Sequence, residues 1–174
     1  MQHALVTGSS AGIGHAIATA LLDAGWQVTG LDRADAAIAH AAYVHRAVDL
    51  TDSAALRTTA QACATVDAFV HAAGVLRVGK VGELDHAGGE LMWKLHVDAA
   101  ARLADVLIPA MAARGNGRVV LIGSRVPTIT SAVTPTGLSG TTIANTQVQY
   151  LDVAGSVPGT SMEGTTFNRQ VFSK

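Results

Sequence analysis

Short apolar runs and segments with helically spaced apolar residues alternate along the first 126 residues. Runs of four to eight apolar residues bounded by glycine or polar residues are typical of buried strands in a parallel sheet. Spacings of three and four residues, followed by a glycine stop, indicate helices. The pattern predicts strands at 4–6, 27–31, 43–48, 66–71 and 118–124. It predicts helices at 13–24, 36–40, 53–64 and 85–113.

The longest of these helices places four leucines on one face, so that this face is expected to be buried. Pro109 lies near its end and is expected to bend the last turns. The helix ends in the polar, glycine-rich stretch 114–117. The four leucines are Leu91, Leu95, Leu103 and Leu107.

The alternation of strands and helices predicts an α/β fold with a Rossmann-like, doubly wound parallel sheet. Right-handed crossovers would stack the strands in the order 3-2-1-4-5. A sixth strand is compatible with the pattern at 148–153. The domain assignment is therefore a dinucleotide-binding unit at 1–126, followed by an atypical tail at 127–174 that packs on the same domain.

Composition supports a single compact domain, because 49% of the residues are hydrophobic and 14% are charged. Beyond residue 126 the chain becomes rich in Thr, Ser and Gly, and no amphipathic helix is legible there. This change leaves three alternatives open for the C-terminal third: a native tail, a truncated family domain or a shifted reading frame.

Charge and cysteine content exclude several classes of partner. The formal net charge is −1 and no run of Lys or Arg occurs, which argues against binding nucleic acid or an anionic membrane. No leader-like start and no apolar run of 18 residues is present, so a cytoplasmic protein is expected. Cys63, the single cysteine, is expected to be a small buried hydrophobe, and the spacing of the seven histidines predicts no metal site.

The chemistry begins at the turn after the first strand, 6–14, which contains Gly8, Gly12 and Gly14. A strand that passes through glycines into a helix directs unpaired N–H groups and the positive end of the helix dipole at one point. A diphosphate fits there, although a glycine turn of purely structural purpose has the same spacing. Gly8 suits a turn conformation, while Gly12 and Gly14 allow close backbone and helix approach.

The second predicted strand ends at Asp32, which completes a βαβ unit with an acidic residue at its tip. A carboxylate there accepts hydrogen bonds from the ribose hydroxyls of NAD and repels the 2′-phosphate of NADP. Arg33 beside it offers the opposite preference, because a guanidinium holds a phosphate. NAD is thus favoured with NADP as the alternative, and a helix-capping carboxylate is the structural alternative for Asp32.

These motifs together resemble the short-chain dehydrogenase/reductase family over residues 1 to about 126. The matching segments are 7–14, Asp32, the Asp49-Leu50 pair, 71–75 and 122–124. The resemblance implies that Gly8, Ser10, Ile13 and Gly14 line the diphosphate, Asp32 the ribose, and Asp49 and Leu50 the adenine. It implies that the backbone of Ala72, Ala73 and Gly74 lies near the nicotinamide. Segment 73–77 also resembles a subgroup that oxidises dihydrodiols of aromatic acids.

The family's proton transfer rests on a Tyr-x-x-x-Lys helix assisted by a Ser and an Asn, and this sequence departs from it. Its two tyrosines, Tyr43 and Tyr150, are followed four residues later by alanine. Ser124 stands at the catalytic serine position, with a turn-forming serine as the alternative. His96 stands where the family has its helix Asn and is a candidate proton relay, with a structural histidine as the alternative. His71 replaces the first Asn of the Asn-Asn-Ala-Gly motif, where a structural role is expected.

Two functional hypotheses follow. The first is an NAD-dependent oxidoreductase that transfers a hydride between the nicotinamide and a small, uncharged alcohol or ketone. The second is a catalytically silent NAD-binding protein, because the residues for proton transfer are altered. By resemblance, a homo-oligomer is expected in either case.

Overall fold

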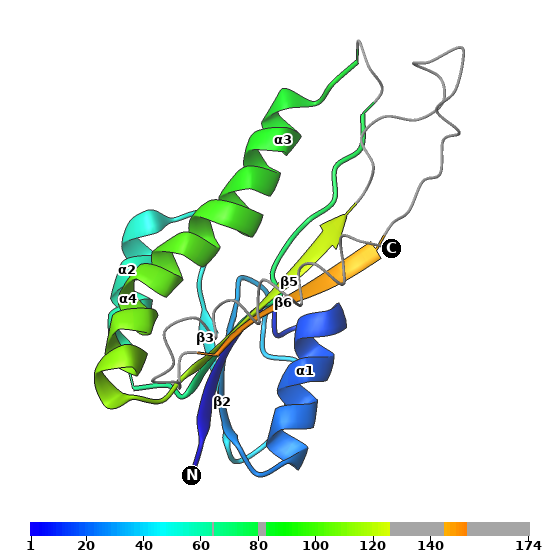
Figure 1. The fold of residues 1–174 in the computed structure, drawn as a ribbon. Helices are drawn as coiled ribbons and strands as arrows, with labels where there is room; N and C mark the ends of the chain where they lie inside the picture. The colour runs from blue at the N-terminus through cyan, green and yellow to red at the C-terminus, as the bar shows by residue number, and fades with distance from the viewer. Residues whose placement is uncertain (64, 80–82, 126–144, 153–174) are drawn as a thin grey trace.

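A computed structural model describes residues 1–63, 65–79, 83–125 and 145–152 of the chain. Its strands form one six-stranded sheet in the order β3-β2-β1-β4-β5-β6 (Figure 1). The first five strands pair in parallel, and β6 runs antiparallel to β5. The strands are β1 (His3–Thr7), β2 (Gln27–Asp32), β3 (Tyr43–Ala47), β4 (Ala68–His71), β5 (Arg118–Arg125) and β6 (Asn145–Asp152).

The predicted order 3-2-1-4-5 is confirmed, and the parallel pairs arise because each strand returns through a crossover on one face of the sheet. The sixth strand forms at Asn145–Asp152, along the full length of β5. Its predicted last residue, 153, and the rest of the proposed tail at 127–144 and 154–174 lie outside the described residues.

Helices cover both faces of the sheet (Figure 1). On one face lies α1 (Gly12–Asp23), and on the other lie α2 (Ser53–Ala62) and α4 (Ala99–Arg114). Two apolar clusters result. The α1 cluster includes Val6, Ala18, Leu22 and Val28, and the α2/α4 cluster includes Leu5, Leu56, Phe69, Leu103 and Leu107.

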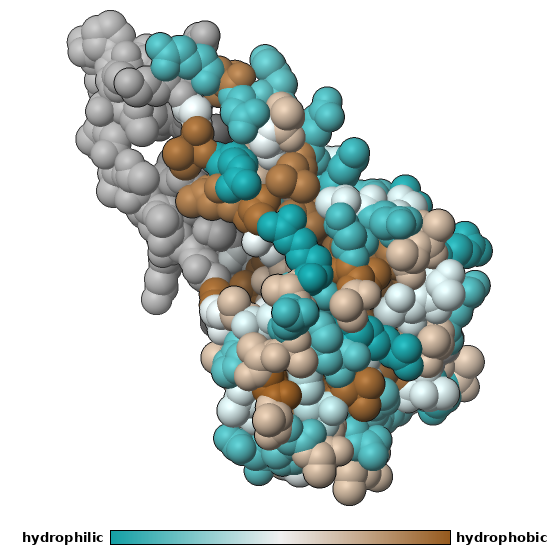
Figure 2. All heavy atoms as spheres, turned by 180° about the vertical axis from the view of Figure 1, so that it is seen from behind, coloured by the Kyte–Doolittle hydropathy of each residue, from teal (hydrophilic) through white to brown (hydrophobic). Residues whose placement is uncertain are grey.

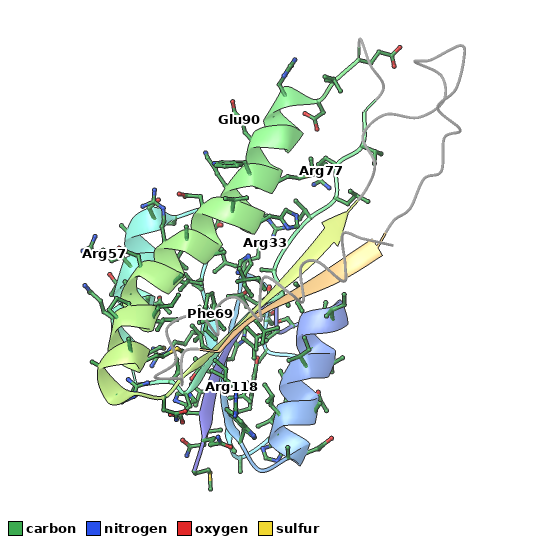
Figure 3. All side chains as sticks on the ribbon, viewed as in Figure 1. Arg33, Arg57, Phe69, Arg77, Glu90 and Arg118 are labelled. Carbon is green, nitrogen blue, oxygen red and sulfur yellow. The ribbon has the colours of Figure 1, made fainter. Side chains whose placement is uncertain are left out.

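The central strands β1, β2 and β4 are buried on both faces, which explains their apolar runs, whereas the edge strand β3 has no fully buried residue. Every residue of β4 is buried, and so are four of the five residues of β1. Figure 3 shows Phe69 of β4 between the sheet and α4, where its ring is fully buried. Cys63 is 3% exposed within the same α2/α4 cluster, as its predicted role as a small hydrophobe requires.

The single helix predicted at 85–113 consists of three consecutive segments. An α-helix, α3 (His86–Trp93), continues into a π-helical turn, η1 (Lys94–Asp98), and then into α4. Of the four predicted buried leucines, Leu103 and Leu107 are fully buried, whereas Leu91 and Leu95 are half-buried. Pro109 lies inside α4.

The helix predicted at 36–40 does not form, and residues 35–40 have no regular structure. Five residues are too few to offset the cost of starting a helix, and all of them but Ile38 are exposed. Ile38 alone packs against the α1 cluster, so no amphipathic face is available to stabilise the segment. In the described part of the chain, no helix is both long and apolar enough to cross a membrane.

Candidate functional site

A cleft of about 150 Å³ lies at the carboxyl edge of the sheet, where the ends of β1 to β4 meet. Parallel strands place the loops that follow them at one edge, so residues far apart in sequence converge there. The cleft is lined by Gly8, Asp32, Arg33, Val48, Asp49, Leu50, Thr51, Ala73, Gly74, Val75, Leu91 and Leu95.

The glycine-rich turn between β1 and α1 is tightly packed. Gly8 has a positive φ of 69°, and a Cβ there would lie 2.8 Å from the Cα of Ala73. A Cβ on Gly14 would lie 2.2 Å from the carbonyl oxygen of Gly8. The helix therefore approaches the turn at Gly14 as closely as the sequence predicts. Gly12 needs its glycine for conformation instead, since its φ is +55° and the space around it is open.

Among the described residues, no side chain caps the start of α1. Its N-cap, Ala11, supplies no side-chain hydrogen bond, and the first turn contains no acidic residue. The hydroxyl of Ser10 is buried without a partner. Ile13 in that first turn is 52% exposed although it is apolar. An uncapped helix start beside an unpaired buried hydroxyl fits an anionic oxygen ligand such as a diphosphate.

Asp32 connects the end of β2 to the glycine-rich turn. One carboxylate oxygen accepts the Ser10 N–H at 3.0 Å, and the other accepts the Ala34 N–H at 3.0 Å. Residues 33–42 contain no helix, so the alternative role of Asp32 as the cap of a helix directly after it is wrong. The exposed Arg33 lies beside it on the same cleft, so the acidic and the basic residue both face the space (Figure 3).

The Asp49-Leu50 pair continues the lining next to Asp32, since the N–H of Val48 donates to the carbonyl of Asp32 at 2.9 Å. Asp49 accepts hydrogen bonds from the backbone N–H and the hydroxyl of Thr51, both at 2.8 Å. These bonds, in that order, and the nearby charge of Arg33 lower the pKa of the Asp49 carboxyl. Leu50 is almost fully buried and extends the α2/α4 cluster to the cleft.

A chain of hydrogen bonds joins the end of β1 to the helix on the far wall. The hydroxyl of Thr7 accepts the N–H groups of Ala72 and Ala73, both at 3.1 Å. It therefore donates its own hydrogen to Nδ1 of His71, at 3.0 Å. The other ring nitrogen of His71 then carries the proton and donates to the carbonyl oxygen of Leu95, at 2.9 Å.

This bond explains the π-helical turn. In an α-helix the N–H of Ala99 would bond to the carbonyl of Leu95, but here it bonds to the carbonyl of Lys94. The Leu95 carbonyl is thus available to His71. The structural role expected of His71 is consistent with its burial at 3% exposure and with both of its ring bonds.

His96 lies in the π-helical turn, and its ring packs against the backbone of Gly74. A Cβ on Gly74 would lie 2.1 Å from the ring carbon Cε1. The Nε2 nitrogen is 2.9 Å from the carbonyl oxygen of Val75 and 3.2 Å from its nitrogen. His96 therefore fixes the loop after β4, and its place in proton transfer stays a prediction.

Of the sequence-predicted residues, seven line the cleft and the rest of the glycine turn lies next to it. Ser10, Gly12, Ile13, Gly14 and Ala72 are outside the lining itself. Ser124 lies in β5, and its side chain is outside the described part of the structure. The lining residues that the sequence analysis missed are Val48, Thr51, Val75, Leu91 and Leu95. Each adjoins a recognised motif or lies on the apolar face of the long helix, so its position in the sequence could have indicated that it lies near the cleft.

A second cavity, of about 340 Å³, lies between the loop after β4 and α3. Its lining includes Arg77, Val78, Leu84, His86 and Met92. Figure 2 shows apolar surface gathered in the upper half of the molecule, the half in which Figure 1 places α3. Within the described residues, no group of three or more His, Cys, Asp or Glu side chains is arranged to hold a metal ion.

Comparison with known proteins gives a consistent result. The model of the short chain dehydrogenase family matches residues 2–136. The chain is 33% identical to galactitol 2-dehydrogenase (L-tagatose-forming) of Cereibacter sphaeroides, over 72% of this chain and 54% of that protein. It is 29% identical to 2,3-dihydro-2,3-dihydroxybenzoate dehydrogenase of Escherichia coli, over 68% of this chain and 49% of that protein.

A solved structure from Beutenbergia cavernae superposes with a TM-score of 0.61 at 27% identity. It is described as a putative NAD(P) dependent gluconate 5-dehydrogenase with bound NADP at low occupancy, and the match covers 68% of this chain and 52% of that one. The chain thus spans about half the length of these three relatives.

We expect Gly14→Ala to lower the free energy of unfolding by about 1–3 kcal/mol, because the added methyl would overlap the Gly8 carbonyl. Gly89→Ala is the matched control, since Gly89 lies in α3 with open space around its Cβ position. Urea unfolding measures both variants. A Gly14→Ala protein as stable as the control would contradict the close approach at this turn.

We expect the protein to lose stability as the pH falls from 7 towards 4. Burial is the largest cause that lowers the pKa of His71 to about 4 from an ordinary value of 6.5. The bond to the Leu95 carbonyl opposes this shift, and the charge of His96 adds to it. Between pH 6.5 and pH 4 the unfolded chain carries a proton on His71 that the folded chain does not. Acid therefore favours unfolding, by about 3 kcal/mol in total.

Urea unfolding at pH 7 and pH 4.5 measures this loss. His71→Gln removes the titrating ring, so its stability should change less between the two pH values than that of the unaltered protein. Equal changes in the two proteins would show that His71 titrates normally in the folded state.

Proposed function

The chain belongs to the short-chain dehydrogenase family, and from this premise we propose that its cleft binds a nicotinamide dinucleotide for oxidation of a small alcohol or reduction of a small ketone. NAD is the proposed cofactor, with NADP as the alternative. The observation that carries the proposal is the convergence of Gly8, Asp32 and Asp49 on one cleft, with Gly8 in the turn that leads to an uncapped helix start.

The proposed binding mode assigns each part of the dinucleotide to one part of the chain. The turn residues Gly8, Ser10, Gly12, Ile13 and Gly14 hold the diphosphate. The buried, unpaired hydroxyl of Ser10 supports this assignment, because a phosphate oxygen would give it a partner. The positive end of α1 adds a favourable field for the anion.

Asp32 would accept hydrogen bonds from the adenosine ribose, and Asp49 and Leu50 would line the adenine. A 2′-phosphate would meet the carboxylate of Asp32, which is the basis for preferring NAD. Arg33 on the same lining supports the NADP alternative, because its guanidinium could pair with that phosphate.

The backbone of Ala72, Ala73 and Gly74 would lie near the nicotinamide, which when bound supplies the hydride acceptor or donor. The N–H groups of Ala72 and Ala73 are held by Thr7, so this segment is rigid before a ligand arrives. His96 packs on Gly74 and keeps the loop after β4 close to the cleft.

The substrate oxygen needs a hydrogen-bond donor and a path for one proton. Ser124 and His96 are the proposed catalytic residues: the serine would polarise the oxygen and the imidazole would relay the proton. In the structure Nε2 of His96 is occupied by the backbone of Val75, so only Nδ1 would remain for a relay. The active form is proposed to be a homo-oligomer with a small-molecule substrate.

A catalytically silent NAD-binding protein is the second candidate. It is favoured by the fact that neither tyrosine of the 174 residues is followed by a lysine four residues later. Without such a pair, the substrate oxygen lacks the tyrosine proton donor with its lowered pKa on which the family relies. In that case NAD binding would control whether the protein associates with another molecule, and the protein would not turn over a substrate.

Titration of the full chain with NADH, followed by NADH fluorescence, tests binding, and a panel of small alcohols and ketones tests turnover. We expect saturable binding. Hydride transfer to any ketone of the panel would reject the silent protein, and saturable binding without turnover would reject the oxidoreductase. No binding of either NADH or NADPH would overturn both candidates.

We expect Asp32→Ala to reduce the preference for NADH over NADPH by about tenfold, because the carboxylate no longer repels the 2′-phosphate. The ratio of the two dissociation constants is the measurement, since a general loosening of the turn affects both nucleotides alike. Asp35→Ala is the matched control, because Asp35 is exposed three residues along and does not line the cleft. An unchanged ratio would show that Asp32 does not contact the ribose.

A further inference from the structure

A pair of hydroxyl groups connects the glycine-rich turn to β3. Ser9 is fully buried at 0% exposure, and its Oγ lies 2.9 Å from the phenol oxygen of Tyr43. Tyr43 is the first residue of β3 and comes 34 residues later in the chain. Neither residue lines the cleft, and the full burial of Ser9 sets its hydroxyl behind the surface of the turn.

The pair can meet only because β2 has a glycine between β1 and β3. A Cβ on Gly30 would lie 2.1 Å from the Tyr43 oxygen and 2.3 Å from the Ser9 oxygen. The φ of Gly30 is not in the left-handed region, so the glycine is needed for space and not for conformation. The ring of Tyr43 also packs against the α1 cluster, which fixes its direction across β2.

Three consecutive residues of the turn are therefore tied to β2 and β3. The N–H of Gly8 donates to the carbonyl of Leu31 at 2.8 Å, and the N–H of Ser10 donates to Asp32. Between them, Ser9 is held by Tyr43. The first two bonds use groups at the very end of β2, whereas the third comes from a side chain of the next strand.

His45 completes the cluster. Its Nδ1 lies 3.5 Å from the phenol oxygen of Tyr43. The phenol hydroxyl is therefore confined between two polar neighbours, the hydroxyl of Ser9 and the imidazole of His45, and its single hydrogen can be donated to only one of them. A hydroxyl confined in this way holds Ser9 in one position.

We propose that Tyr43 is a positioning residue of the dinucleotide site: through its hydrogen bond to Ser9 it holds the glycine-rich turn in the form that receives the diphosphate. The inference rests on the proposed function. Because the turn is already ordered, binding does not have to bear the entropy cost of fixing it. Loss of the phenol hydroxyl leaves the ring and its packing in place, and within the turn it releases Ser9.

The experiment compares Tyr43→Phe, Ser9→Ala and the double variant in the full chain, with NADH dissociation constants from fluorescence titration. Each single variant should weaken binding about fivefold, which is the typical effect of one lost hydrogen bond. The double variant should be no weaker than either single one, because both remove the same bond. Independent effects that multiply in the double variant would overturn the proposal.

Thr29→Val is the matched control. Thr29 also lies in β2, is buried, and makes one hydrogen bond of 2.9 Å, to Nε2 of His3, away from the turn. It should lower the midpoint of thermal unfolding as much as Tyr43→Phe does and leave the dissociation constant unchanged. An equal loss of affinity in Thr29→Val and Tyr43→Phe would mean that Tyr43 acts only through general stability, and would overturn the proposal.

The test separates this inference from the proposed function. If the unaltered chain binds NADH and Tyr43→Phe binds it equally well, the positioning role is overturned and the proposed function stands. If the unaltered chain binds neither NADH nor NADPH, the proposed function fails and the inference fails with it.

Discussion

The hydroxyl of Thr7 is the contact on which the arrangement of the cleft depends. It is fully buried at the end of β1, accepts two N–H groups from the end of β4 and bonds to His71. Through His71 it reaches the carbonyl of Leu95 in the long helix. One side chain thus sets the positions of the segment proposed to face the nicotinamide and of the helix that forms the opposite wall.

The same physical logic recurs on the other side of β1. Burial in a parallel sheet leaves few polar groups, and each of these is paired with a group from another strand or loop. Asp32, Tyr43 and Leu31 each hold one residue of the glycine-rich turn. The exceptions among the described residues are two buried side-chain atoms without a partner: Nε2 of His45, and the hydroxyl of Ser10 beside the uncapped start of α1. The unpaired Ser10 hydroxyl and the uncapped helix start are the features that support the proposed diphosphate site.

Binding and chemistry are separable in this chain. The groups proposed to bind the dinucleotide lie in the turn after β1, the start of α1, the end of β2 and the loops that follow β2, β3 and β4, and all are described. The groups proposed to move a proton are Ser124, whose side chain lies outside the described residues, and His96, whose Nε2 is engaged by Val75. Family membership therefore supports the binding role more directly than it supports a particular reaction.

The sequence alone determined the architecture, because strand burial and helix amphipathicity leave periodic marks in the chain itself. It placed the five parallel strands, their order and the residues of the glycine-rich turn, Asp32 and Asp49, which follow strands in a recognisable way. It failed at 36–40, where a short alanine-rich segment has no surface to cover. Only the tertiary structure decided the π-helical turn. The Leu95 carbonyl, which an α-helix would use, bonds instead to His71, which lies 24 residues earlier in the chain. Likewise, nothing near Tyr43 in the sequence indicates Ser9, since a hydrogen bond between distant side chains depends on the space that Gly30 leaves between two strands.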